Sequence, residues 1–168
     1  MIDLSTNEGR GGLILGITRI ILGFMFIWAF FDKLLGLGML TTPEAAVING
    51  GSPTAYYLSQ LVSGPFEGMW NALAGNAFID FLLMFGLLAV GACLMLGIAS
   101  KLSTISIVIM MALMFTLCIP PSDNPLVDYH IVYIVASLAI YFLNGFSYIG
   151  LEDRWRELGI VKKLPILE

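Results

Sequence analysis

The hydrophobic positions of this chain fall into four long apolar stretches separated by polar segments. The first covers residues 12–37, and the others cover about 78–98, 102–119 and 129–149. A helix rises about 1.5 Å per residue, so the first stretch would be about 39 Å long, enough to cross the roughly 30 Å hydrocarbon core of a bilayer. The pattern predicts an all-α, integral membrane four-helix bundle.

Residues 38–77, between the first two spans, contain too many glycines and prolines to form another span. Thr42 and Ser52 each precede a proline, Pro43 and Pro53, which is typical of the start of a helix. We expect two or three short helices that form an extracytoplasmic cap between the first and second spans.

Composition supports the membrane interpretation and indicates an orientation. The chain is 58% hydrophobic and 12% charged, far from the balance of a soluble domain. The first apolar stretch lacks a secretory cleavage site, so we expect it to be retained as a span. All lysines and arginines except Lys33 fall at the end of the bundle that carries the termini. The positive-inside rule then places both termini in the cytoplasm.

The remaining parts of the chain fit a single membrane domain, residues 1–168. Its tail, residues 150–168, has mixed charge and is expected to form one short helix on the cytoplasmic surface. The net charge of −4 and the lack of basic clusters argue against a nucleic-acid partner.

Two cations lie within the first span. Gly12, Gly16 and Gly23 form one face at helical spacing, and Arg19 and Lys33 lie within about 60° of that face. Small residues mark the side on which membrane helices approach closely. We therefore expect both cations to point into the bundle. The alternative is that each extends to the nearer layer of lipid headgroups.

The fourth span carries a polar stripe whose six members fall within about 60° on a helical wheel. In hydrocarbon such groups need partners, so we expect the stripe to face other helices or a cavity. It is either a seam of interhelical hydrogen bonds or part of a site. For Arg19 we expect one of two kinds of partner. These are the last three residues of the stripe, Tyr141, Asn144 and Tyr148, or a lipid phosphate. The stripe consists of His130, Tyr133, Ser137, Tyr141, Asn144 and Tyr148.

The only histidine, His130, begins the fourth span at the same outer level as Asp80, Asp128 and Lys33. A histidine near carboxylates can exchange protons, and a neighbouring cation can orient a carbonyl or anionic oxygen. These groups would suit a quinone headgroup, with His130 and Asp128 or Asp80 handling protons and Lys33 orienting the ligand. Surface capping and salt bridges are the alternative explanation.

The cysteines, Cys93 and Cys118, are expected to differ in depth by about 15–20 Å, too far for a disulfide. One histidine cannot supply bis-histidine haem ligation, and two cysteines cannot hold a four-thiolate iron–sulfur cluster. We expect no metal, haem or iron–sulfur cofactor. Electron transfer would then require a bound quinone or a partner protein.

Four segments occur in a characteristic order: TRIILGFMFIWAFFDKL, INGGSPT, IDFLLMFGLL and PPSDNPLVDYHIVY. Together they resemble the DoxX/DoxD family over nearly the whole chain. The resemblance implies a four-helix membrane bundle. Some family members look like the membrane subunit of thiosulfate:quinone oxidoreductase, which oxidises thiosulfate to tetrathionate and reduces quinone. The family's recurrent polar positions map onto Arg19, Lys33, Asp80, Asn124, Asp128 and His130.

The leading hypothesis is a redox-linked subunit of the cytoplasmic membrane that binds a quinone or similar small ligand at the outer mouth of the bundle. If it is an enzyme, we expect a subunit like thiosulfate dehydrogenase (quinone). The competing hypothesis is a non-catalytic scaffold or assembly factor. Expected partners are the lipid bilayer and either a membrane or extracytoplasmic protein or further copies of the chain. The candidate catalytic residues are His130, Asp128 and Asp80, and the candidate ligand-binding residues are Lys33, Tyr133, Asn124, Arg19 and Tyr141.

Overall fold

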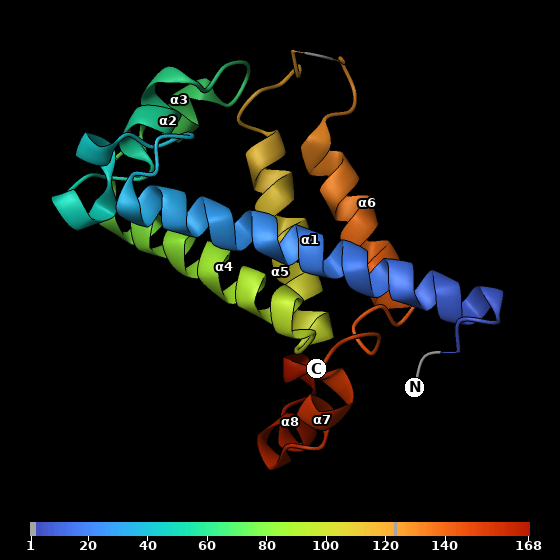
Figure 1. Cartoon of the computed structure of the whole chain (residues 1–168). Helices are drawn as coiled ribbons and strands as arrows, with labels where there is room; N and C mark the ends of the chain where they lie inside the picture. Colours follow the sequence, from blue (N-terminus) through green and yellow to red (C-terminus); the bar gives the residue numbers. More distant parts are fainter. Residues whose placement is uncertain (1–2, 123) are drawn as a thin grey trace.

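The computed structural model describes residues 3–122 and 124–168, with only the backbone of Tyr56. These residues form helices and loops without a β-strand (Figure 1). The chain order is α1 (Asn7–Leu35), α2 (Ala55–Gln60), α3 (Glu67–Asn71), α4 (Ala77–Leu96), α5 (Ser100–Phe115), α6 (Tyr129–Phe142), α7 (Glu152–Arg156) and α8 (Gly159–Lys163). The described residues also form short 3-10 turns at Pro43–Ala45, Val47–Asn49 and Pro165–Leu167. The predicted all-α class is confirmed.

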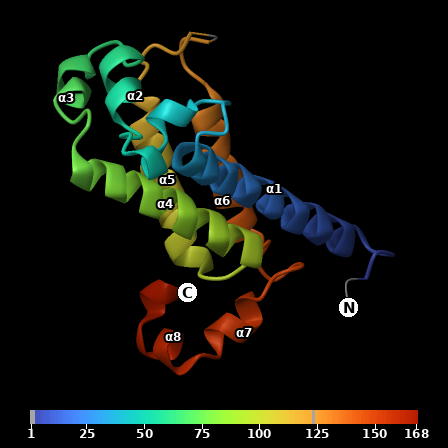
Figure 2. The same cartoon turned by 60° about the vertical axis from the view of Figure 1, so that its left-hand side comes forward.

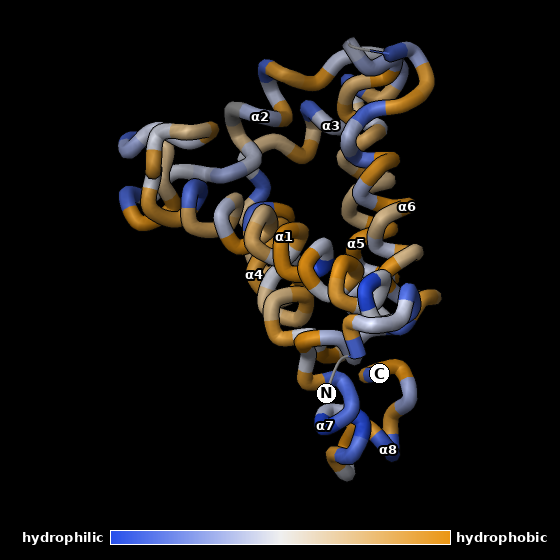
Figure 3. Tube along the Cα trace, turned by 45° about the vertical axis from the view of Figure 1, so that its right-hand side comes forward, coloured by the Kyte–Doolittle hydropathy of each residue, from blue (hydrophilic) through white to orange (hydrophobic). Residues whose placement is uncertain are grey.

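The four long helices form two antiparallel pairs. Helix α1 packs along α4, and α5 packs along α6, while the second pair crosses the first steeply (Figures 1 and 2). Helices α2 and α3 lie over the end where α1 stops and α4 starts, and the tail helices α7 and α8 lie at the opposite end of α4. Hydrophobic residues run along the four long helices, whereas the tail and connecting loops are more polar (Figure 3).

The long helices differ in length. Among the described residues, α1 with 29 residues and α4 with 20 are long and apolar enough to cross a membrane. Helices α5 and α6 are apolar but have only 16 and 14 residues. At about 1.5 Å per residue they are about 24 and 21 Å long.

Glycines allow α1 to approach its neighbours closely, as the sequence predicted. A Cβ atom added at Gly23 would lie 2.8 Å from the Cβ of Leu94 on α4, and one at Gly91 would lie 2.8 Å from Ile27 Cγ1 on α1. Gly12 and Gly16 are likewise buried, both against Tyr148. The glycine face of the first span is therefore a packing face. It lets apolar side chains of α1 and α4 join one hydrophobic core.

Helix α6 ends at Phe142, seven residues before the expected end of the fourth span at residue 149. Asn144 and Ile149 adopt left-handed backbone angles, with φ of 56° and 53°, so the chain turns instead of extending the helix. The amide of Gly145 donates to the carbonyl oxygen of Ile140 at 2.7 Å, which closes the end of the helix. Asn144 and Tyr148 therefore lie beyond the helix on which the polar stripe was predicted.

The tail forms two short helices where one was expected. Glu152 at the start of α7 is buried, and its Oε1 accepts from Ser100 Oγ at 2.6 Å and Arg156 Nε at 3.0 Å. The indole of Trp155 donates to the carbonyl oxygen of Leu167 at 2.6 Å, so the chain folds back after α7. These bonds fasten the tail to the beginning of α5.

Candidate functional site

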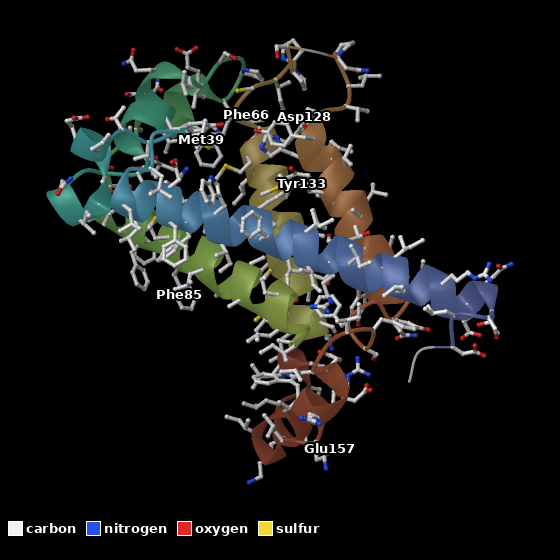
Figure 4. The ribbon with its side chains drawn as sticks, viewed as in Figure 1. Met39, Phe66, Phe85, Asp128, Tyr133 and Glu157 are labelled. Carbon is white, nitrogen blue, oxygen red and sulfur yellow. The ribbon has the colours of Figure 1, made fainter. Side chains whose placement is uncertain are left out.

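The main cavity has a volume of about 590 Å³ and lies between α1, α4, α5, α6 and the cap. Most of its lining is aromatic, aliphatic or methionine side chain, including Trp28 of α1 and Trp70 of α3. The ionisable side chains Asp32, Lys33 and His130 also line it, together with three tyrosines, Tyr57, Tyr129 and Tyr133. We call this cavity the outer pocket. Figure 4 shows Met39 and Tyr133, two of its residues, on the same side of the molecule as Asp128.

A histidine–aspartate pair borders the outer pocket. Asp128 is the N-cap of α6: its Oδ1 accepts from the backbone amides of His130 at 2.9 Å and Ile131 at 3.3 Å. Its other oxygen, Oδ2, lies 2.6 Å from His130 Nδ1. A carboxylate at this distance requires the proton on Nδ1, so the neutral ring carries its lone pair on Nε2. One carboxylate therefore both starts the helix and fixes the tautomer of a buried, pocket-lining histidine.

Lys33 supplies the positive charge of the outer pocket. It lies in the last turn of α1, and its ammonium forms no hydrogen bond or ion pair with any residue that the structure describes. The neighbouring Asp32 is 1% exposed, and its two oxygens accept from the amides of Met39 and Leu40 at 3.1 Å each. Asp32 thus holds the loop after α1 and leaves the ammonium group of Lys33 available in a mostly apolar cavity.

Tyrosines form part of the same wall. Tyr133, predicted as a ligand-binding residue, lines the outer pocket and donates its hydroxyl to the sulfur of Met25 at 3.2 Å. Tyr57 and Tyr129 share a hydrogen bond, and burial raises the pKa of the Tyr57 phenol. Sequence reasoning missed Tyr57, Tyr129 and Asp32 as pocket residues. Tyr129 and Asp32 could have been found from the sequence, because they are adjacent to the predicted residues His130 and Lys33. Tyr57 could not, because it belongs to the cap, where no periodic hydrophobic pattern predicts the fold.

Asp80 and Asn124 are two of the predicted site residues that do not line the outer pocket. Asp80, a candidate proton carrier, accepts from the amide of Thr54 at 3.0 Å and its hydroxyl at 2.6 Å, so it ties α4 to the cap. Asn124 accepts from the amides of Leu126 at 3.0 Å and Val127 at 3.3 Å, in an exposed loop. The cap therefore engages the Asp80 side chain, and the Asn124 side chain is engaged within its own loop. The structure brings together Lys33, His130 and Tyr133, with Asp128 behind the histidine.

Arg19 is fully buried at the opposite end of the bundle. Among the described residues, its guanidinium donates to five backbone carbonyls and no carboxylate: those of Leu94, Met95 at 3.3 Å, Gly145 at 3.3 Å, Tyr148 at 3.2 Å and Ile149 at 2.8 Å. Of the partners expected from the sequence, Tyr148 accepts through its backbone. Arg19 is thus enclosed by carbonyl groups and lies away from the outer pocket.

Tyr141 lines a second, smaller cavity of about 350 Å³ between α5 and α6, which also includes Lys101. It therefore does not join the outer pocket. The two cysteines, Cys93 and Cys118, are both free thiols. Within residues 3–122 and 124–168, no group of three or more histidine, cysteine or acidic side chains is placed to hold a metal ion.

Comparison of the chain with protein-family models, with curated proteins and with solved structures finds no match. The resemblance to the DoxX/DoxD family therefore rests on the four sequence segments alone. The geometry of the outer pocket does not depend on that resemblance.

Proposed function

We propose that this chain is a multi-pass protein of the cytoplasmic membrane, of DoxX/DoxD type, that binds a quinone or a ligand of similar shape in the outer pocket. In this proposal α1, α4, α5 and α6 all cross the bilayer, the cap is extracytoplasmic and both termini are cytoplasmic. The observation that carries the proposal is an apolar cavity that contains a carboxylate-oriented histidine and a lysine that forms no hydrogen bond or ion pair with a described residue.

The outer surfaces of the long helices support the membrane placement. Large apolar side chains are exposed on each of them, among them Ile14 of α1, Phe81 of α4, Ile109 of α5 and Val135 of α6. Soluble monomers rarely expose continuous apolar surface of this extent, whereas lipid chains cover it without cost. Helices α5 and α6 are short for a span, and we propose that the bilayer thins around them.

The outer pocket has suitable size and polarity for a quinone. Its volume of about 590 Å³ falls in the range of about 300–1,000 Å³ that is typical of small-molecule sites. Trp28, Trp70 and Met114 offer flat or flexible apolar surface for a ring and its hydrocarbon tail. Lys33 can donate to one ring carbonyl, and His130 Nε2 can accept from the hydroxyl of the reduced ligand.

Reduction of a quinone to a quinol consumes two electrons and two protons. In the proposal His130 carries one proton to or from a ligand oxygen, while Asp128 stabilises the imidazolium that forms. Lys33 stabilises the negative charge that develops on the opposite oxygen until that oxygen takes the second proton from solvent. The electrons come from a partner protein or a donor such as thiosulfate.

A binding experiment tests the site. Trp28 and Trp70 line the outer pocket, so quenching of tryptophan fluorescence by a short-chain ubiquinone reports binding to protein in lipid nanodiscs. We expect Lys33→Met to weaken binding by tenfold or more, because a charge-assisted hydrogen bond contributes about 1.5–3 kcal/mol. Lys162→Met, on the exposed tail, is the matched control. Equal affinities for native protein and Lys33→Met would overturn the assigned role.

A second experiment separates the histidine pair from helix capping. Asparagine caps a helix about as well as aspartate, so Asp128→Asn should keep α6 but lose the carboxylate that orients His130. We expect this variant, like His130→Ala, to reduce thiosulfate-dependent quinone reduction in membranes by about 100-fold. Unchanged activity in His130→Ala would remove the histidine from the mechanism.

The competing proposal is a membrane scaffold or assembly factor, and the exposed apolar residues of the cap region favour it. Leu40 is 79% exposed and Met39 71%, and Ile48 and Met69 are also exposed. Such a surface could dock an extracytoplasmic partner. Loss of a co-purifying subunit in Ile48→Ser, together with native quinone affinity in Lys33→Met, would favour the scaffold over the quinone site.

A further inference from the structure

The cavity between α5 and α6 forms a groove on the side of the molecule away from the outer pocket. We call it the α5–α6 groove. Its volume is about 350 Å³, and its lining includes Lys101, Thr104, Ile105 and Ile109 of α5 with Leu138 and Tyr141 of α6. Lys101, Ile105 and Ile109 recur every four residues, so they form a row about 12 Å long on one face of α5. The groove therefore has a cation at one end and an apolar floor along its length.

An unsatisfied hydroxyl group lies in this groove. Thr104 is 4% exposed, and its Oγ1 has no hydrogen-bond partner among the described residues. Its neighbours in α5 behave differently: Ser103 and Ser106 donate to the carbonyls of Ala99 and Leu102, each at 2.8 Å. Buried polar groups are nearly always paired, so the unpaired hydroxyl of this groove residue can still take a partner from a ligand.

Two further polar groups of the groove are available for binding. The ammonium of Lys101 forms no ion pair or hydrogen bond with a described residue, and the same holds for the hydroxyl of Tyr141. The backbone oxygen of Glu168 accepts hydrogen bonds from the amides of Lys101 at 2.7 Å and Leu102 at 2.9 Å. These bonds involve the backbone of Lys101 and not its ammonium group. A ligand for this groove must therefore combine negative charge, hydrogen-bonding oxygens and an apolar chain.

We propose that the α5–α6 groove binds one anionic phospholipid from the cytoplasmic leaflet. Lys101 contacts the phosphate, the hydroxyls of Thr104 and Tyr141 bind the glycerol and ester oxygens, and one acyl chain lies along Ile105, Ile109 and Leu138. Lys101 lies in the first turn of α5, at the end that faces the cytoplasm in the proposed membrane orientation, and basic pockets between spans at this level suit anionic lipid headgroups. The inference rests on that orientation and not on the quinone site.

Native mass spectrometry of the detergent-purified protein tests this inference. We expect one phosphatidylglycerol adduct at lipid concentrations where phosphatidylcholine gives little. Lys101→Met should reduce the adduct about fivefold, which corresponds to about 1 kcal/mol for one lysine near a lipid surface. Thr104→Val keeps the shape but removes the hydroxyl and should reduce it about twofold to threefold. Lys162→Met is the control and should retain the adduct.

Two further measurements test the lipid site. Ile109→Trp fills the groove without changing its charge, and we expect it to abolish the adduct while the protein stays folded by thermal unfolding. Quinone quenching of Trp28 and Trp70 should be unchanged in Lys101→Met, so failure of the quinone proposal would be seen separately. Equal binding of the two lipids by native protein, or a native adduct level in both Lys101→Met and Ile109→Trp, would overturn the lipid site.

Discussion

Arg19 and Lys33 lie on the same helix, yet their surroundings are opposite. Arg19 is fully buried and donates to five backbone carbonyls from two other parts of the chain. Lys33 lines a cavity of about 590 Å³ and has no hydrogen bond or ion pair with a described residue. A charge in an apolar helix is therefore structural where the chain supplies its partners, and available for a ligand where it does not.

The two regions differ because opposite ends of the neighbouring helices meet α1 there. At the Arg19 end, α4 and α6 both stop, and carbonyls at and beyond their last turns, which have no partner within a helix, turn toward the guanidinium. At the Lys33 end, α4 and α6 begin, and their first amides are capped by Asn76 and Asp128. Helix ends that offer carbonyls bind a cation. Helix starts that are already capped leave the cation of Lys33 available for a ligand.

The largest difference should appear on replacing each cation with methionine. Arg19→Met leaves five carbonyls without their donor, and we expect a loss of about 3–5 kcal/mol in the free energy of unfolding. Lys33→Met should change it by less than about 1 kcal/mol, since no bond to a described residue is lost. Thermal and denaturant unfolding in detergent measures both. Similar losses in the two variants would break the comparison.

A smaller effect should come from the glycine that brings α1 against the acceptors of Arg19. A Cβ at position 23 would lie 2.8 Å from the backbone nitrogen of Met95, so Gly23→Ala must push α1 away from α4. We expect a loss of about 1–3 kcal/mol by the same unfolding measurement. Gly11→Ala is the matched control, because nothing lies within 4 Å of its added Cβ. It should be neutral or stabilise α1 by up to about 1 kcal/mol. A loss in Gly11→Ala as large as that in Gly23→Ala would contradict the packing argument.

The smallest effect should distinguish Tyr133 from Tyr141, two tyrosines of α6. Tyr133 lines the outer pocket, whereas Tyr141 lies in the α5–α6 groove. Tyr133→Phe removes one hydroxyl from the proposed quinone site, and we expect a twofold to fivefold loss of affinity in the fluorescence titration. Tyr141→Phe should leave that affinity unchanged. A larger loss of affinity in Tyr141→Phe than in Tyr133→Phe would show that the ligand does not bind in the outer pocket.

Several features could be predicted because they depend on local spacing. The buried positions of Gly12, Gly16, Gly23 and Arg19 follow from the helical period, which carries over directly into a helix of 29 residues. The proximity of Asp128 to His130 follows from their separation by one residue at a helix start. For such groups the sequence determines the geometry before any tertiary contact forms.

Other features depend on contacts between distant segments and were missed. Asp80 was expected at the same level as the pocket residues. Its carboxylate instead accepts a hydrogen bond from the hydroxyl of Thr54 in the cap. Helix α6 was expected to continue to residue 149, but the chain turns after Phe142 at Asn144 and Gly145, residue types that are common at helix ends. The carbonyls of Gly145 and Ile149 then bind Arg19, which is a contact between distant segments.

The carbonyl cage around Arg19 also has a consequence for biosynthesis. The acceptors of Arg19 lie 75 to 130 residues later in the chain, so the arginine leaves the ribosome before them. Until residues 145–149 have been synthesised, the guanidinium lacks most of its native acceptors and must remain near water or lipid phosphate. The end of the bundle around Arg19 can therefore close only after residues 145–149 have been synthesised.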